Sequence, residues 1–132
     1  MPTFQVPPEH IAAAWAVGGK DIERACAYGN VDVPELVAKI GSFEWQFWII
    51  WSETDYAGAI VTAIEVWPDH KALRIIAAGG DGKTREMAQE TLEAFARAEG
   101  CKHLIMWGRK GWQRRLKDWR VSRVEMTKEI AP

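Results

Sequence analysis

The ten residues IIAAGGDGKT, at positions 75–84, form the glycine-rich stretch around which the other predicted elements are arranged. Positions 77–84 nearly match the phosphate-binding pattern GxxxxGK[ST], with Ala77 in the place of the first glycine. A turn of this kind in front of a helix presents backbone N–H groups and the positive end of the helix dipole, and both attract anions. The stretch therefore predicts an anion-binding turn, and its neighbours decide which kind.

The residues after this turn predict a helix and then a strand. From residue 85 to 99 apolar side chains recur on one helical face, Thr84 is a candidate N-cap, and Gly100 can end the helix. The apolar run 103–107 (HLIMW) follows as a strand. The turn thus belongs to a strand–helix–strand crossover, whose two strands run parallel.

Two shorter elements are expected after the crossover. A short helix from Trp112 would place Leu116 and Trp119 on its buried face. Residues 123–130 alternate polar and apolar side chains, which predicts a strand with one face in water.

The residues before the turn predict helices followed by an antiparallel meander. A brief strand and three helices are expected in the first third of the chain, at 3–6, from 8 or 9 to 17, 21–28 and 34–40. Gly18 and Gly19 separate the first two helices in this interpretation. Three strands joined by short turns follow, at 44–51, 58–67 and 72–78. The first of them, EWQFWIIW, is apolar on much of both faces, so it is expected to be buried on both sides.

The order of these elements argues against a nucleoside-triphosphate-binding loop. Such a loop follows the first strand of a parallel sheet, since later strands supply the metal-binding aspartate. Here the turn follows the fourth predicted strand. The sequence predicts instead one α+β domain over residues 1–132, with a mixed sheet of about six strands, N-terminal helices, the meander and the crossover.

This order resembles that of the GNAT acetyltransferase superfamily over nearly the whole chain. In that family the fourth strand diverges from the fifth, and the loop before the long helix binds the pyrophosphate of acetyl-CoA. The resemblance implies that the backbone of Ile76, Ala77 and Ala78 contacts the pantetheine arm. It also implies a set of pyrophosphate-binding residues in the turn, namely Gly80, Asp81, Gly82, Lys83 and Thr84.

Two features depart from the family pattern. The loop pattern [QR]xxGx[GA] aligns its first glycine with Gly82, so that Gly79 stands in the place of Arg or Gln and Thr84 in that of the final Gly or Ala. In active members a tyrosine protonates the leaving thiolate, and its position falls near Leu116 here.

The candidate catalytic base is Glu65, near the end of the strand predicted at 58–67. Under the acetyltransferase hypothesis it would take a proton through water from an unknown amine substrate. His70 and His103 are the alternatives.

A second hypothesis is a non-catalytic binding protein. The segments AAGG, ARAEGC and GRKGW are similar to short GNAT-like proteins of tailed phages and prophages. That similarity implies a virion-associated or host-factor-binding role, in which Arg109 and Trp112 would contact a protein partner.

A third hypothesis, nucleic-acid contact, comes from the charge distribution. Residues 102–123 hold eight Lys and Arg against one Asp, whereas residues 1–101 hold eight against 15 Asp and Glu. A +7 segment interleaved with Trp107, Trp112 and Trp119 could pair with phosphates and stack on bases.

Composition excludes several other classes. The chain has no apolar run approaching ~18 residues and no basic-then-apolar leader, which argues against a membrane span or secretion. Cys26 and Cys101 lie far apart without other metal-ligating residues, so neither a metal site nor a disulfide framework is expected. We therefore expect a protein of the host-cell cytoplasm or of the virion, with acetyl-CoA as the only cofactor considered.

Overall fold

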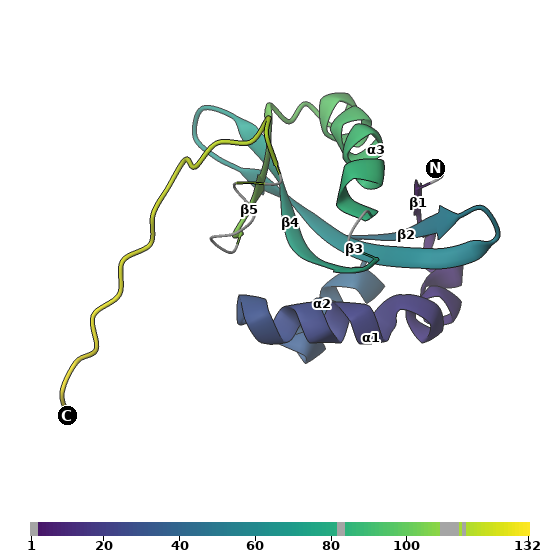
Figure 1. The fold of residues 1–132 in the computed structure, drawn as a ribbon, viewed down its shortest axis with the longest axis horizontal. Helices are drawn as coiled ribbons and strands as arrows, with labels where there is room; N and C mark the ends of the chain where they lie inside the picture. The colour runs from purple at the N-terminus through teal and green to yellow at the C-terminus, as the bar shows by residue number, and fades with distance from the viewer. Residues whose placement is uncertain (1–2, 82–83, 109–113, 115) are drawn as a thin grey trace.

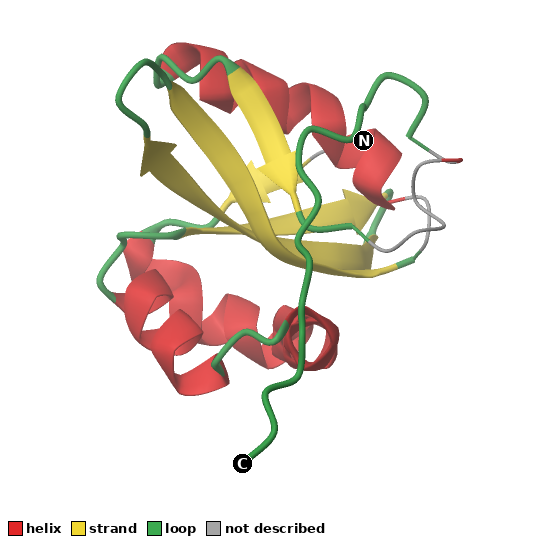
Figure 2. Ribbon diagram, turned by 90° about the vertical axis from the view of Figure 1, so that its left-hand side faces the viewer, coloured by secondary structure: helices red, strands yellow, loops and turns green. Residues whose placement is uncertain are grey.

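A computed structural model describes residues 3–81, 84–108, 114 and 116–132, and its centre is one twisted sheet with helices on both faces (Figure 1, Figure 2). The strands are β1 (Thr3–Gln5), β2 (Gln46–Ser52), β3 (Asp55–Val66), β4 (Lys71–Gly80) and β5 (His103–Met106). The helices are the 3₁₀ turn η1 (Pro8–His10), α1 (Ile11–Gly29), α2 (Val33–Gly41) and α3 (Thr84–Ala98). Helices α1 and α2 cover one face of the sheet, and α3 covers the other (Figure 1).

The strands lie in sequence order, β1 to β5, and all neighbouring pairs are antiparallel except β4 and β5, which are parallel. This arrangement confirms the predicted meander and crossover. The described residues form five strands where about six were predicted, because the prediction of a strand at 123–130 is wrong. Those residues leave the sheet as exposed, irregular chain (Figure 1). Alternation gives a segment one apolar face, but a strand also needs a neighbour for its backbone hydrogen bonds.

Helix α1 is one continuous helix, so the prediction of two helices separated at Gly18 and Gly19 is wrong. Glycine within a helix costs about 1 kcal/mol relative to alanine and does not by itself end the helix. Both glycines are buried here, and a Cβ on Gly18 would lie only 2.9 Å from the Cβ of Ala59 in β3. The small size of Gly18 lets α1 approach β3 closely, whereas Gly19 leaves room for the ring of Trp15 in the same helix. The helix ends at Asn30, which has the left-handed backbone conformation typical of such ends (φ 55°).

The remaining elements predicted up to residue 107 agree with the structure to within three residues. Helix α2 begins after Asp32, whose side chain accepts a hydrogen bond from the backbone N–H of Glu35 at 3.0 Å. Helix α3 ends before Gly100, which has φ 78°, and the N–H of Cys101 donates to the carbonyl of Ala96 at 2.7 Å. Gly100 therefore ends α3, as predicted.

Strand β2 is buried on both faces, also as predicted. Phe47 and Ile49 pack in the core between the sheet and α1, whereas Trp48 and Ile50 pack in the core beneath α3. Three polar groups form a chain of hydrogen bonds in this buried strand pair. The Trp48 indole N–H donates to Thr62 Oγ1 at 2.9 Å, and the Thr62 hydroxyl donates to Gln46 Oε1 at 2.8 Å. The network satisfies polar atoms that would otherwise be costly to bury.

The two cysteines, Cys26 and Cys101, are free and buried. Burial raises the pKa of both thiols.

Candidate functional site

The candidate site is the place where β4 continues beyond the end of β5. Strand β5 pairs with β4 only from Ala72 to Ile75, and its last residue, Met106, is opposite Ile75. Residues 76–80 of β4 extend further, and among the described residues no strand pairs with them on that side. The β3 register also shifts here, since Val61 is opposite Ala77 and Thr62 opposite Ile75, which leaves Ile76 as an extra, bulged residue. Among the described residues, the backbone groups on this edge therefore have no partner strand on the β5 side.

Gly79 and Gly80 belong to β4 in the structure, although the sequence placed them in the turn. A Cβ on Gly79 would lie 2.6 Å from the backbone carbonyl oxygen of Asp21 in α1. Gly80 has φ 122°, and a Cβ there would lie 2.4 Å from the carbonyl oxygen of Ala57. Both positions therefore require glycine for packing, whatever else they contact.

Two hydrogen bonds hold this end of β4 in place. The backbone N–H of Asp81 donates to the Ala57 carbonyl at 2.9 Å, so a ligand contact by Asp81 would need another atom. The Tyr56 hydroxyl donates to Asp21 Oδ2 at 2.6 Å. Burial raises the pKa of Tyr56 well above its ordinary value, and the Asp21 carboxylate adds to the shift. The link from β3 to α1 stabilises the position where α1 contacts Gly79.

The turn that follows leads directly into α3. Gly82 and Lys83 lie outside the described residues, and α3 begins at Thr84. The first N–H groups of a helix this long have no partner within the helix and carry the positive end of its dipole. The start of α3 is thus adjacent in sequence to the open edge of β4.

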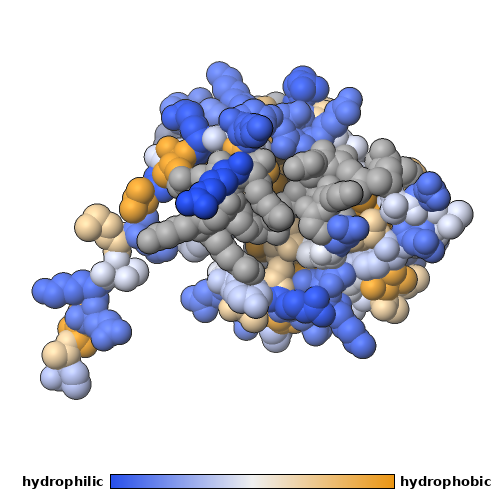
Figure 3. All heavy atoms as spheres, in the orientation of Figure 1, coloured by the Kyte–Doolittle hydropathy of each residue, from blue (hydrophilic) through white to orange (hydrophobic). Residues whose placement is uncertain are grey.

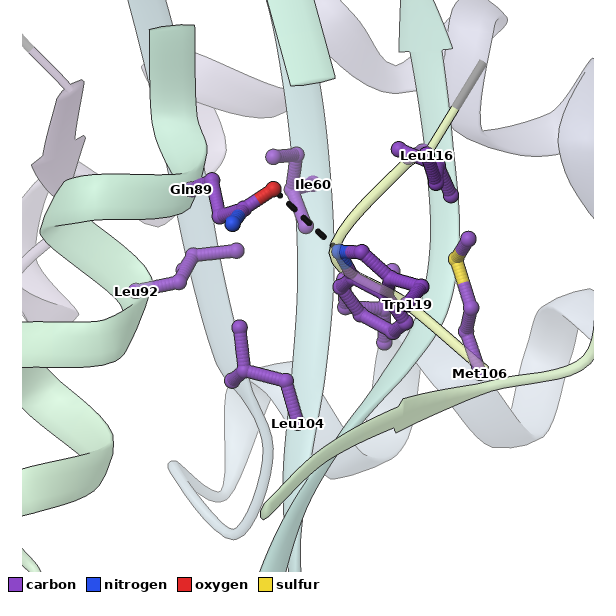
Figure 4. Close-up of a pocket in the computed structure, with 9 residues that line it drawn as sticks. Ile60, Gln89, Leu92, Leu104, Met106, Leu116 and Trp119 are labelled. Atoms are coloured by element: carbon purple, nitrogen blue, oxygen red, sulfur yellow. Dashed lines mark hydrogen bonds between the residues drawn. The ribbon is translucent and has the colours of Figure 1, made fainter. Parts of the chain in front are cut away.

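A small apolar hollow lies between α3, β4 and β5 (Figure 4). Its volume is about 20 Å³, which is room for about one water molecule. Leu116 and Trp119, from the segment after β5, close one side of it. The Trp119 indole N–H donates to Gln89 Oε1 at 3.2 Å, and the Gln89 amide donates to Asp118 Oδ2 at 3.0 Å. Gln89 therefore ties this segment to α3.

The predicted burial of Leu116 and Trp119 is confirmed, since both are half-buried. The expected helix that would carry them starts at Trp112, outside the described residues, and its described part around residues 117–118 is a turn. Arg109, the other proposed partner contact, also lies outside the described residues.

Glu65 lies on β3 and forms an ion pair with Arg74 of β4. The Arg74 Nε–H and one terminal N–H donate to the two carboxylate oxygens. Glu65 is opposite Ala72, four residues before Ile76, which is roughly 13 Å along the strand at 3.3 Å per residue. Its proposed role as base stays a prediction.

Sequence reasoning did not assign a role to Arg74, although an arginine in the apolar run ALRIIAA is a visible signal. Its guanidinium carbon also lies 5.5 Å from the ring centre of Trp107, which is 74% exposed. Glu65, Arg74 and Trp107 thus form one partly exposed cluster.

The alternative bases His70 and His103 lie at the other end of β4. His70 Nδ1 is 2.7 Å from Asp69 Oδ1, and the two histidine rings are 5.1 Å apart. His70 precedes β4, whereas His103 pairs with Ala72, which Glu65 also opposes, so His103 is level with Glu65 along the sheet.

The described residues contain no group of three or more His, Cys, Asp or Glu side chains that could hold a metal ion. None of the described helices has the length and apolar character needed to cross a membrane.

Comparison with known proteins identifies the fold. No protein-family model and no curated protein matches the chain. A GNAT family acetyltransferase from Staphylococcus aureus matches with a TM-score of 0.65 at 10% identity, covering 98% of each chain. A GCN5-related N-acetyltransferase from Ralstonia eutropha gives 0.63 at 15% identity, covering 99% of each. A predicted acetyltransferase with acetyl-CoA from Clostridium acetobutylicum gives 0.62 at 10% identity, covering 98% of this chain and 95% of that one. The chain therefore has a GNAT-like fold, as its order of elements predicted.

Proposed function

We propose that the chain is an acetyl-CoA-dependent N-acyltransferase that acts on an amine. The observation that carries this proposal is the stretch of β4 after Ile75, which lacks a strand on its β5 side and leads into the start of α3. An elongated ligand with amide groups can hydrogen-bond along such a strand edge, and its phosphates can bind the N–H groups of the helix start. Acetyltransferases with the same fold, one of them with acetyl-CoA, support this choice of ligand.

In this proposal the backbone of Ile76, Ala77 and Ala78 binds the pantetheine arm. The pyrophosphate binds at the turn, with Gly80, Gly82, Lys83 and Thr84 as its contacts. Asp81 holds the turn against β3 through its hydrogen bond to Ala57. The Lys83 charge offsets the repulsion between the Asp81 carboxylate and a phosphate.

Acetyl-CoA would supply an acetyl group activated as a thioester. The task left to the chain is to position the amine and accept its proton. Glu65 is our candidate for the acceptor, and because it lies about 13 Å along the sheet from the open edge, it would act through a chain of several waters. Its carboxylate already accepts two hydrogen bonds from Arg74, which fixes its orientation.

Calorimetry and thermal shift with acetyl-CoA and CoA test the proposal. We expect the wild type to bind both and Gly82→Glu to lose binding, because a carboxylate in the turn would repel the pyrophosphate. Gly41→Glu is the matched control, since Gly41 ends α2 and nothing lies within 4 Å of a Cβ built there. If the wild type shows neither heat nor stabilisation at millimolar cofactor, the proposal is wrong.

A second candidate is a non-catalytic binding protein with the same fold, of the virion-associated or host-factor-binding kind. The hollow between α3 and β5 favours this candidate, because Leu116 and Trp119 already occupy one side of it and leave little room for a substrate. Absence of acetyl-CoA binding in the wild type would leave this candidate.

A further inference from the structure

A short piece of chain after β5 lies across the hollow between α3, β4 and β5. This piece, residues 116–119, belongs to no strand of the described sheet, and we call it the strap. Leu116 and Trp119, at its two ends, are half-buried and line the hollow, whereas 117 and 118 are exposed (Figure 4). Its backbone forms a turn, in which the Trp119 N–H donates to the Leu116 carbonyl at 3.1 Å. Among the described residues the strap therefore contacts the body through side chains and not through a strand ladder.

One side chain of α3 holds the strap in place. Gln89 Oε1 accepts from the Trp119 indole N–H at 3.2 Å, and the Gln89 amide donates to Asp118 Oδ2 at 3.0 Å. The bond to Asp118 is exposed and the bond from Trp119 is only partly buried. Water can replace either partner at such positions, so each bond adds little net stability. The strap can therefore leave the hollow without unfolding the sheet or α3.

The hollow lies where the proposed function places the thioester end of the ligand. With the phosphates at the start of α3 and the pantetheine arm along residues 76–78, the thioester reaches Ile75, where β5 ends at Met106. Ile75, Ala78 and Met106 all line the hollow. Its volume, about 20 Å³, holds about one water molecule, which is far less than the arm requires. The arm can occupy this place only after the strap has moved out.

The chain beyond the strap lets it move and still keeps it nearby. Residues 120–132 are exposed and run away from the body, and in Figure 3 this part of the chain stands apart (Figure 1). Four residues after Trp119, the Arg123 guanidinium carbon lies 3.9 Å from the ring centre of Trp67, which follows β3. This contact keeps the chain attached, so a displaced strap stays close to the hollow.

We propose that the strap is an autoinhibitory contact. In the free chain Leu116 and Trp119 occupy space that the ligand needs, and Gln89 holds them there. The ligand and the strap then compete, and the measured affinity is reduced by the fraction of molecules whose strap is open. This inference rests on the proposed function, because it takes acetyl-CoA or CoA as the competing ligand. It accounts for a nearly filled hollow beside an edge of β4 that has no partner strand.

Calorimetry with CoA on the full chain tests the proposal, with Gln89→Leu as the variant. Leucine is similar in size and forms no side-chain hydrogen bond, so the variant loses both bonds to the strap and keeps the wall of the hollow. We expect CoA to bind this variant about 5- to 30-fold more tightly than the wild type, because the closed form is weakened by two hydrogen bonds. Ala94→Leu, at an exposed position of the same helix, is the matched control and should bind CoA like the wild type.

The NMR signal of the Trp119 indole N–H gives a second readout, which uses the wild type and is assigned by its absence in Trp119→Phe. We expect CoA to shift this signal and to speed its exchange with water, because the indole leaves Gln89. Unchanged or weaker CoA binding by Gln89→Leu, or an indole signal that bound CoA leaves unaltered, refutes the inference and leaves the proposed function standing. If neither the wild type nor the variant binds CoA, both are wrong.

Discussion

Replacing Gly79 with alanine tests whether this glycine serves packing or ligand binding. The new Cβ would meet the Asp21 carbonyl oxygen at 2.6 Å and the Asp21 Cβ at 2.9 Å. The nearest atom is helix backbone, so α1 itself would have to shift. Overpacking of this kind costs about 2 kcal/mol. For a chain of 132 residues that lowers Tm by roughly 6–10 °C, by interpolation between the values for smaller and larger domains.

The assay is thermal and urea unfolding followed by circular dichroism, with Gly41→Ala as the control. Gly41 lies at the end of α2 with nothing within 4 Å of a Cβ added there, so alanine at this position should leave stability unchanged or raise it by about 0.5 kcal/mol. If Gly79→Ala is as stable as the wild type and only its cofactor affinity falls, the glycine serves the ligand and our packing argument is refuted.

Three further predictions concern other parts of the chain. Tyr56→Phe should lower the free energy of unfolding by about 2 kcal/mol, because it leaves the Asp21 carboxylate without this donor. The pKa of Tyr56 is raised in the folded state, so the stability of the wild type should fall above about pH 10, more steeply than that of the variant. Asn30→Ala should lower the free energy of unfolding by about 1 kcal/mol, whereas Asn30→Gly should not, since φ is 55° there; equal losses would contradict this. Glu65→Gln should reduce acetyl transfer by about 10²-fold or more with cofactor affinity unchanged, measured by turnover and calorimetry once an amine is found; full activity would remove Glu65 as the base.

The sequence predicted elements well where one signal dominates. Helix α3 has a clear apolar period and Gly100 at its end, and β2 has apolar residues on both faces, so both were located correctly. The failures come from residues whose effect depends on distant neighbours. Gly18 and Gly19 suggest a helix break because the close approach of Gly18 to β3 is invisible in the sequence. Likewise, alternation over 123–130 does not say whether a partner strand is within reach.

The candidate site shows the same limit. The family resemblance implied that β4 diverges from β5 before a helix, but nothing in the sequence indicated the role of Gly79, because Asp21 lies 58 positions earlier in the chain. The hydrogen bond between Gln89 and Trp119 likewise joins residues 30 positions apart, and the sequence does not indicate that they are neighbours.

The buried hydrogen bonds of Gln46, Trp48 and Thr62 have a consequence for how β2 is aligned. A strand that is apolar on both faces could slide along its neighbour by one residue and still bury apolar side chains, so hydrophobicity alone specifies its register weakly. Gln46 and Thr62 are directly opposite in the register observed, and Trp48 reaches the same hydroxyl from two residues along. A slip would separate all three and leave polar atoms buried without partners. The network therefore selects one alignment of β2 among several of similar apolar content.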